Sequence, residues 1–313
     1  MKKCLIISDI YFECPQQLKE YEIIRLGFLK KVNRMGKYKR AFYLRTNNTK
    51  QFDFFTIEEA SKIAPNTDIV ILFDGTKNRI LSEFAKQIEK VIDPQIIRLI
   101  FYFWNTIISS EGLQLSPKWE INTFDKRDAI KYAYRYVGGF YNCLFSENII
   151  DTTSDVFFIG VNKGRFDFIK SLQTILIENN LTTDFIYVDN VKSLYNSQYS
   201  KFMPYAEILT RCNKSKAILD VVKSNQFGLT LRVYEGIFMN KKIITTNDNI
   251  LQYKFYNPQN ILLLNPTTSI NVIKEFLNTP IVPYSDQIKQ TYSFESWITR
   301  IIDLNIHFND TNS

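Results

Sequence analysis

Residues 217 to 247 read AILDVVKSNQFGLTLRVYEGIFMNKKIITTN, and this stretch decides the fold. The apolar run from Ala217 to Val222 predicts a buried strand, which a polar loop follows. Thr230 then opens a helical pattern that ends at Asn240, before a second strand over Ile243–Thr245. Strand, loop, helix and strand in this order form a βαβ unit. Its loop and helix start favour anions and ribose, because the first helical N–H groups are unpaired.

Two ionisable side chains stand in the first turn of this predicted helix. Arg232 is able to reach back over the helix start, and Glu235 is an acceptor three positions further on. An arginine for phosphate and a carboxylate for ribose hydroxyls are what a nucleotide diphosphate requires. The alternative is structural, with Glu235 complementing the helix dipole and Arg232 as its surface partner.

Composition sets the class of protein. The 313 residues are enough for two domains of about 150 residues each, and 45% hydrophobic with 23% charged residues is typical of a globular chain. The net charge of +7 suits an acidic partner such as a nucleotide-linked substrate, a nucleic acid or an anionic membrane surface. The nearest approach to a basic patch spans residues 30–40, and a solvated helix end explains it equally well.

Cysteine and histidine usage narrows the chemistry. The four cysteines form no C-x-x-C pair, which favours thiols in a reducing compartment. The only histidine is His307, so histidine-rich metal sites and Ser-His-Asp catalysis are disfavoured, and a carboxylate is the expected general base. The apolar run at the start of the chain meets Asp9 too soon to be a signal peptide or a spanning helix.

Strands alternate with helices along the first half of the chain, which predicts parallel βαβ units. The expected strands cover 4–8, 41–44, 69–73, 97–103 and 121–124, and the expected helices cover 18–35, 57–63, 79–92 and 125–136. Polar residues 146–155 then interrupt the pattern and are interpreted as an interdomain connection. A fresh series follows, with strands over 156–161, 185–188, 217–222, 243–245 and 261–264 and helices over 166–177, 205–212, 230–239 and 270–276.

Ligands of such sheets lie at the carboxyl ends of the strands. In the first half this edge carries Asp9 and Glu13, and a loop after a first strand seldom needs two acids for structure alone. Asp74, which Gly75 follows, is interpreted as a turn residue, and Trp104 as a packing residue.

The loop Gly160-Val161-Asn162-Lys163-Gly164-Arg165 follows the first strand of the second half. Its glycines permit close backbone approach, and its basic side chains suit phosphate, although it matches neither GxxxxGK[ST] nor GxGxxG. The chain ends in SFESWITRIID, residues 293–303, which predicts an amphipathic helix capped by Ser293. This helix either packs on its own domain or crosses back to the first.

These features together resemble a GT-B glycosyltransferase. The residues that carry the likeness are IFYFWNTI, TFDKRDAIKYAYRY, FFIGVNKGR and the specific run DVVKSNQFGLTLRVYEGIFMNKKIITTNDNILQYKFYN. Among these enzymes, the chain most resembles the bacterial capsule and lipopolysaccharide transferases that are related to the spore-maturation glycosyltransferases. The resemblance implies two Rossmann-like domains facing across a cleft. An acceptor-side domain is expected over 1–150, a nucleotide-sugar domain over 151–290, and a helix and tail over 291–313 that cross back to the first domain.

The resemblance also implies residue roles. Glu235 matches the acid that binds the donor ribose, and the diphosphate lies near the loop and helix start of the second domain. The expected donor-binding residues are Gly160, Lys163, Arg165, Gln226, Gly228, Leu229, Thr230, Arg232 and Glu235. Asp9 or Glu13 is the expected catalytic base. No Asp-x-Asp motif occurs, so no metal or other cofactor is expected. The retaining transferases' Glu-x7-Glu pattern would need an acid at position 227, where this chain has Phe227, and this departure favours an inverting mechanism.

The expected function is therefore sugar transfer from a nucleotide-sugar donor to a bacterial surface glycan or lipid-linked glycan. The expected site of action is the cytoplasm, with peripheral contact to the inner membrane. Two alternatives stay open. One is a non-catalytic nucleotide- or polyanion-binding protein of a glycan assembly complex. The other is nucleic-acid binding, which ranks last because the aromatic residues fall in strand and helix patterns rather than beside a basic face. No nucleic-acid partner is therefore expected.

Overall fold

The computed structural model describes residues 1–9, 16–18, 20–30, 49–107, 113–142, 151–162, 164–189, 192–194, 196–222 and 226–312. The chain divides into two compact units, Met1–Gly138 and Gly139–Ser313. The break between them lies earlier in the chain than the boundary expected at residue 150. Residues 143–150, which hold the first half of the predicted connection, are outside the described residues.

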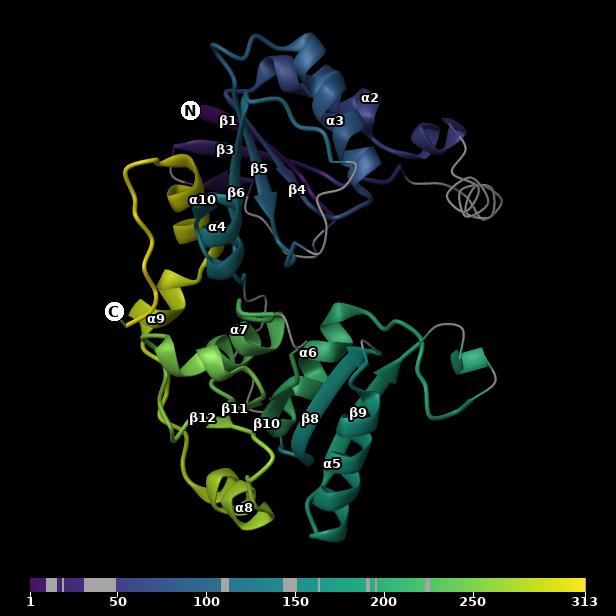
Figure 1. Cartoon of the computed structure of the whole chain (residues 1–313), viewed down its shortest axis with the longest axis vertical. Coiled ribbons are helices and arrows are strands. Elements are labelled where there is room, and N and C mark those ends of the chain that lie inside the picture. The colour runs from purple at the N-terminus through teal and green to yellow at the C-terminus, as the bar shows by residue number, and fades with distance from the viewer. Residues whose placement is uncertain are drawn as a thin grey trace. The chain divides into compact units, whose positions relative to one another are not determined.

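The first unit is built on a seven-stranded sheet in the order β2-β3-β1-β4-β5-β6-β7 (Figure 1). Every neighbouring pair is parallel except β2 with β3. The strands are β1 (Lys2–Ile7), β2 (Gln17–Leu18), β3 (Tyr21–Leu26), β4 (Ile69–Phe73), β5 (Arg98–Phe103), β6 (Trp119–Thr123) and β7 (Arg135–Tyr136). All five residues of β4 are buried, which explains why an uninterrupted apolar run forms a central strand.

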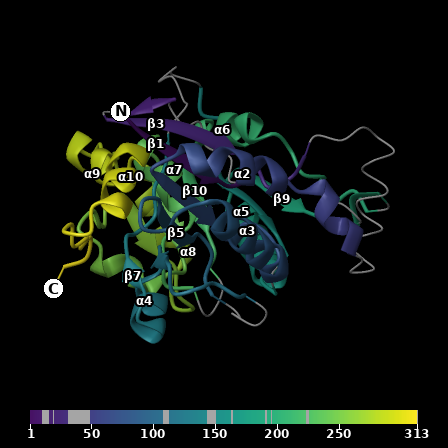
Figure 2. The ribbon, with the colours of Figure 1, turned by 90° about the horizontal axis from the view of Figure 1, so that it is seen from above.

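The helices of the first unit are η1 (Thr49–Phe54), α2 (Ile57–Ile63), η2 (Ala64–Asn66), α3 (Asn78–Val91) and α4 (Lys126–Tyr132). Helices α2, α3 and α4 were predicted, whereas the short 3-10 helices η1 and η2 were not. Helices α2 and α3 lie side by side in both ribbon views (Figure 2). Asp125 caps α4 by accepting hydrogen bonds from the backbone N–H groups of Arg127 and Asp128, as predicted. The helix ends early, at Ala133, because this residue has a φ of 55°.

The helix predicted over residues 18–35 is wrong where the structure describes that segment. Residues Tyr21–Leu26 form β3, which pairs in parallel with β1 from Lys2 to Ile7. Burial alternates along β3, with Tyr21 and Ile23 buried, so a period of two applies here. The adjacent β-branched residues Ile23 and Ile24 favour a strand, and pairing with β1 overrides the helical spacing. The strand predicted over 41–44 lies outside the described residues.

The second unit is built on a five-stranded parallel sheet in the order β12-β11-β10-β8-β9. Its strands are β8 (Ser154–Val161), β9 (Thr183–Val188), β10 (Ser215–Asp220), β11 (Lys242–Thr245) and β12 (Ile261–Leu263). Its helices are α5 (Phe166–Glu178), η3 (Lys192–Leu194), α6 (Tyr205–Asn213), α7 (Leu231–Phe238), η4 (Asp248–Gln252), α8 (Ile270–Asn278), α9 (Asp286–Thr291) and α10 (Phe294–Ile302). The helix α9 and the short 3-10 helices η3 and η4 were not predicted.

Helices cover both faces of this second sheet. Val156 and Phe158 of β8 belong to a cluster with residues of α5 and α8, whereas Phe157 joins Cys212 of α6 on the other face. Successive side chains of a strand point to opposite faces of the sheet. A strand that is apolar at every position therefore packs against helices on both faces. The second unit is therefore a doubly wound Rossmann-like layer structure.

Strand order fixes where a ligand site belongs in each unit. In the second sheet, β8 and β10 are neighbours. The chain continues from β8 to β9 on one side of this pair and from β10 to β11 on the other side, so the two connections run in opposite directions. In the first unit the same relation holds for β1 and β4. The crevice at such a switch point, at the carboxyl ends of the two strands, is where α/β sheets bind ligands.

The C-terminal helix α10 belongs to the second unit. Ser293 caps it by accepting a hydrogen bond from the backbone N–H of Ser296, as predicted. Trp297 is fully buried, and its ring lies 4.4 Å from that of Phe140. Arg300 donates to the backbone carbonyl of Gly139, which ties the end of the chain to the start of the unit. The crossing of this helix to the first unit stays a prediction.

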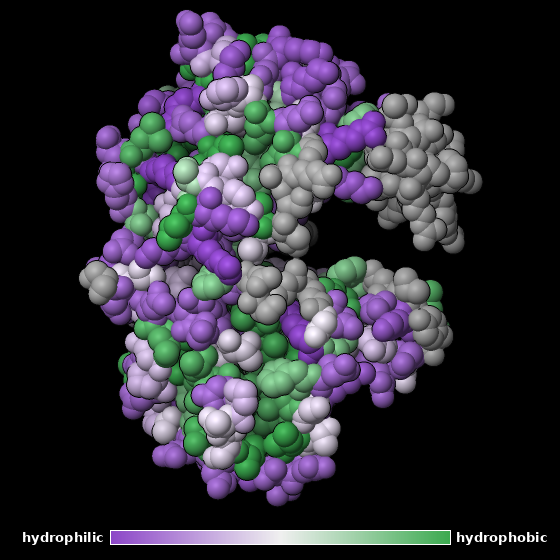
Figure 3. All heavy atoms as spheres, in the orientation of Figure 1, coloured by the Kyte–Doolittle hydropathy of each residue, from purple (hydrophilic) through white to green (hydrophobic). Residues whose placement is uncertain are grey.

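The visible surface mixes hydrophilic and hydrophobic residues (Figure 3). Within the described part of the chain, no helix combines the length and the apolar character that crossing a membrane requires.

Candidate functional site

The loop after β8 places Arg165 at the switch point of the second unit. Gly160 has no side chain, and a Cβ there would lie 3.1 Å from Nη2 of Arg165, so glycine leaves room for the guanidinium. Gly164 has a φ of 78°, a conformation that other residues rarely adopt. Arg165 is partly buried, and its Nε is a buried donor that has no hydrogen-bond partner among the described residues. Burial lowers the pKa of Arg165 from its ordinary value, and Asp220 opposes this.

The loop after β10 is organised by Asp220, whose role was not predicted from the sequence. The buried carboxylate accepts hydrogen bonds from the hydroxyls of Thr230, at 2.8 Å, and Thr245, at 2.9 Å. Burial raises its pKa, and these hydrogen bonds and Arg165 oppose the rise. Thr230 is the N-cap of α7, but its side chain makes no capping hydrogen bond because it donates to Asp220. The first turn of α7 thus lacks a side-chain cap.

Arg232 and Glu235 meet on α7, as their spacing predicts. Nη1 of Arg232 lies 2.6 Å from Oε2 of Glu235, and the exposed fractions of the two side chains are 14% and 0%. Burial raises the pKa of Glu235, and the Arg232 guanidinium opposes this rise. Burial disfavours charge on Arg232, but Glu235 together with Tyr205, Cys212 and Tyr141 more than compensates, so the pKa of Arg232 is raised. The two groups form a desolvated ion pair.

Two tyrosines complete this buried group. The hydroxyl of Tyr205, at the start of α6, donates to Oε1 of Glu235 at 2.8 Å. The hydroxyl of Tyr141 lies 3.1 Å from that of Tyr205. Both carboxylate oxygens of Glu235 therefore face partners from their own unit. A ribose hydroxyl would have to displace Tyr205 or Arg232 to reach this carboxylate, so the ribose role of Glu235 stays a prediction. What the geometry does support is that Glu235 holds Arg232 in place.

The other predicted donor residues divide into three groups. Gly228 and Leu229 are buried beside the start of α7, and Leu229 packs in the core cluster with Val233 and Ile237. Gln226 is partly buried in the loop that leads to them. Lys163 lies outside the described residues.

In the first unit, Asp9 has a structural partner. Its Oδ1 accepts a hydrogen bond from the backbone N–H of Phe28 at 2.7 Å, which joins the end of β1 to the end of β3. A Cβ at Gly27 would lie 3.0 Å from the same oxygen, so glycine allows this approach. Glu13 lies outside the described residues. The role of either acid as a base stays a prediction.

Asp74 lies on the same sheet edge and contributes to a pocket of about 430 Å³ that Asn78, Phe103 and Asn105 also line. Its carboxylate accepts hydrogen bonds from the backbone N–H groups of Trp104 and Asn105. Burial raises the pKa of Asp74 to about 7, although these hydrogen bonds oppose the rise. The interpretation of Asp74 as a turn residue was incomplete. Its position directly after the central strand β4 was the available signal.

We expect the free energy of unfolding of the first unit to depend on pH because of the raised pKa of Asp74. The folded-state pKa of Asp74 lies above its ordinary value, so its contribution to stability is present below about pH 4 and is lost as pH rises toward about 7. Asp74→Asn should remove this decline. Urea unfolding at pH 4.5, 6 and 7.5, followed by Trp104 fluorescence, measures it. A constant difference between wild type and variant across this range would contradict the assigned pKa.

No protein-family model matches the chain, and no curated protein matches its sequence. Solved structures do match. An alpha-glucosyltransferase in complex with UDP and a 13-mer DNA containing a HMU base is 11% identical, with a TM-score of 0.59 over 98% of this chain and 96% of that one. An alpha-glucosyltransferase with UDP-glucose and DNA containing an abasic site is 11% identical, with a TM-score of 0.56 over 96% and 92%. Sucrose-phosphate synthase from Thermosynechococcus elongatus is 10% identical, with a TM-score of 0.50 over 96% and 92%.

At such identities the comparisons show the fold. Each unit of this chain is a Rossmann-like α/β structure with a parallel or mostly parallel sheet, and both units are matched together over nearly the whole length. The predicted fold class is confirmed: the chain has the GT-B fold.

Proposed function

We propose that this protein is a glycosyltransferase that moves a sugar from a nucleotide-sugar donor to a glycan acceptor. The second unit binds the donor, and the first unit supplies the acceptor side. We place it with the bacterial capsule and lipopolysaccharide transferases that are related to the spore-maturation glycosyltransferases, acting in the cytoplasm with peripheral contact to the inner membrane.

One observation carries the proposal: two arginines stand at the switch point of the second sheet. Arg165 follows β8 and has a buried Nε without a described partner, and Arg232 lies in the first turn of α7. Asp220 acts electrostatically on both guanidinium groups, so they belong to one local field. Guanidinium groups and a helix start without a side-chain cap are suited to a diphosphate.

This arrangement supports cleavage of the sugar–phosphate bond. The departing nucleoside diphosphate gains negative charge as that bond breaks, and donors that are already oriented stabilise the charge at little reorganisation cost. Metal independence is part of the proposal, and turnover that persists in EDTA is the outcome that bears it out.

The first unit provides the base that takes the proton from the acceptor hydroxyl. Asp9 and Glu13 are the acids proposed from the sequence. Asp74 joins them, because its pKa of about 7 suits a group that exchanges protons near neutral pH. Inversion at the anomeric carbon is the outcome expected of a single base, and NMR of the product's anomeric proton decides it.

The first test is thermal shift with UDP, GDP, CMP and dTDP, followed by donor-cleavage assays with the matching nucleotide sugars. A ligand that binds the folded state raises the apparent melting temperature, by RT ln(1 + [L]/Kd) in free energy. We expect one base to stand out and its nucleotide sugar to be cleaved. The absence of a shift with every nucleotide would contradict donor binding.

Two alternatives are separated by the same assays. A nucleotide-binding protein without catalysis would show the thermal shift but no cleavage. A nucleic-acid acceptor needs a separate transfer assay, because two of the matching alpha-glucosyltransferases were solved with DNA. The exclusion of nucleic acid made from the sequence therefore has no support, and transfer of labelled sugar to DNA would overturn the glycan acceptor.

A further inference from the structure

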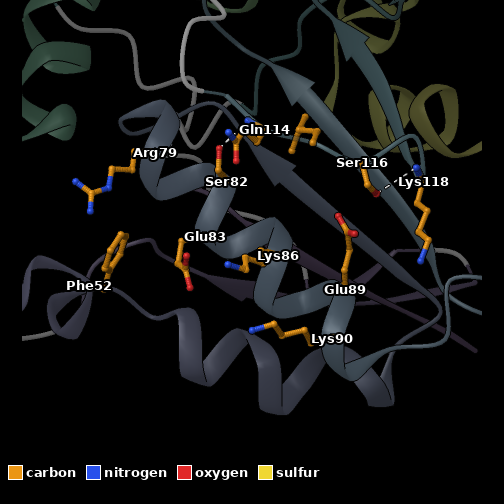
Figure 4. A pocket seen from close by; sticks show the side chains of 11 residues that line it. Phe52, Arg79, Ser82, Glu83, Lys86, Glu89, Lys90, Gln114, Ser116 and Lys118 are labelled. Atoms are coloured by element: carbon orange, nitrogen blue, oxygen red, sulfur yellow. Dashed lines mark hydrogen bonds between the residues drawn. The ribbon is translucent and has the colours of Figure 1, made fainter. Parts of the chain in front are cut away.

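A groove of about 790 Å³ lies along helix α3, wholly within the first unit (Figure 4). One wall is α3, and the segment 114–118 that leads into β6 forms another. Gln114 donates its backbone N–H to the hydroxyl of Ser82, and Trp119 donates its indole N–H to Glu89, so this segment is attached to α3 at two places. The groove is thus a built feature of the fold.

Cations line the groove from end to end. Arg79, Lys86 and Lys90 project from α3, and Lys118 stands on the opposite segment. Arg79 and Lys90 are about 16 Å apart along the helix axis, at about 1.5 Å per residue. Within the described part of the chain, no carboxylate forms an ion pair with Lys86, Lys90 or Lys118. These charges are available to an anionic ligand.

Two carboxylates share the groove with the cations. Oε1 of Glu83 accepts from the Gln87 amide at 2.6 Å, and Oε1 of Glu89 accepts from the Trp119 indole at 2.7 Å. The second oxygen of each acid has no hydrogen-bond partner among the described residues. Such oxygens accept hydrogen bonds from hydroxyl groups, and they repel a backbone that carries a phosphate at every unit. A ligand rich in hydroxyls that carries scattered negative charge fits better than a nucleic acid.

One end of the groove carries an aromatic ring. The Arg79 guanidinium carbon lies 5.5 Å from the centre of the Phe52 ring, and Leu115 adds a further apolar group to the lining. The C–H face of a sugar ring packs on such surfaces, and Gln114 and Ser116 add polar groups elsewhere along the lining. We infer that the groove binds a segment of a negatively charged glycan, with Lys86 and Lys90 contacting its anionic groups.

This site goes beyond the proposed function, because it lies along the helix rather than at the carboxyl edge of the sheet, and binding there requires no donor. The ligand is identified by direct titration in the absence of nucleotide. The probes are a galacturonic-acid tetramer, the neutral maltotetraose and a short single-stranded DNA. We expect the uronic-acid tetramer to bind most tightly and its affinity to fall as salt rises.

The variant Lys86→Gln/Lys90→Gln should bind the uronic-acid tetramer about tenfold more weakly, since two exposed charge contacts are lost. Glutamine keeps a good helix propensity, so α3 should stay folded. Lys2→Gln/Lys201→Gln removes the same charge from two exposed positions outside the groove and should bind as the wild type does. Equal binding of the neutral tetramer, tighter binding of DNA, no measurable binding of the uronic-acid tetramer, or an equal loss in both double variants would overturn the inference. Sugar transfer is not measured in this experiment, so the two proposals fail independently.

Discussion

Replacing Arg232 by methionine should lower the free energy of unfolding of the second unit by about 3–5 kcal/mol. Methionine keeps the apolar stem but leaves Glu235, which has no exposed surface, without its cation. The hydrogen bond from Tyr205 is neutral and offsets only part of this cost. Denaturant unfolding followed by Trp297 fluorescence, with Trp104 and Trp119 replaced by phenylalanine, reports on the second unit.

The loss should depend on pH with a definite sign. Without Arg232, burial raises the pKa of Glu235 further above its unfolded value, so stability is lost as pH rises through the folded pKa. The variant should thus be closer to wild type at pH 5 than at pH 8. Adding Glu235→Gln should restore most of the loss at pH 8, because no charge is then buried.

An exposed pair supplies the control for this prediction. Arg211 and Asp184 lie 3.0 Å apart, with side-chain exposures of 41% and 29%. Arg211→Met should cost at most about 1 kcal/mol, because water screens such pairs. If Arg232→Met cost no more than Arg211→Met, the Arg232–Glu235 pair would not be desolvated in solution.

Replacing Arg165 by alanine should reduce kcat/KM for donor cleavage about a hundredfold or more, the cost of removing one donor from a developing anion. Stability should change little or rise. Burying the Nε of Arg165 without a hydrogen-bond partner among the described residues costs free energy in the folded state. No carboxylate of the described residues forms an ion pair with Arg165. A stability gain with lost activity is common where a site is built for a ligand.

Two variants sharpen the Arg165 prediction. Arg165→Lys keeps the charge but loses the planar fork, so it should recover only part of the activity. Arg211→Ala is the matched control and should cleave the donor normally. Nucleotide titration adds a second readout, because the Arg165→Ala loss should be larger for a nucleoside diphosphate than for a monophosphate. Wild-type affinity for the diphosphate would exclude Arg165 from phosphate contact.

The sequence predicted the elements whose pattern is local. The continuous apolar run at Ile69–Phe73 and the amphipathic spacing around Trp297 are sufficient for β4 and α10. Strand β3 was missed, because its apolar residues also fit a helix and only its pairing with β1 decides for a strand. The Ala133 helix end depends on a positive φ, which a sequence rarely reveals outside glycine.

The same division holds for the site. Arg232 and Glu235 were predicted together because three positions bring two side chains to one face of a helix. Tyr205, Tyr141 and Asp220 come from other elements, so only the tertiary fold brings them in. The pKa of Asp74 depends on its burial at a sheet edge, which Asp-Gly spacing does not encode.

Tyr141 is connected to the Arg232–Glu235 ion pair through Tyr205. The second unit begins at Gly139, so this tyrosine is among the first residues of that unit. Its hydroxyl contacts Tyr205, which contacts Glu235, which in turn holds Arg232. Neutralising the guanidinium with a bound phosphate would weaken its hold on the carboxylate and loosen both tyrosines. One ion pair and two hydroxyl contacts thus connect the proposed phosphate-binding arginine to the first residues of the second unit.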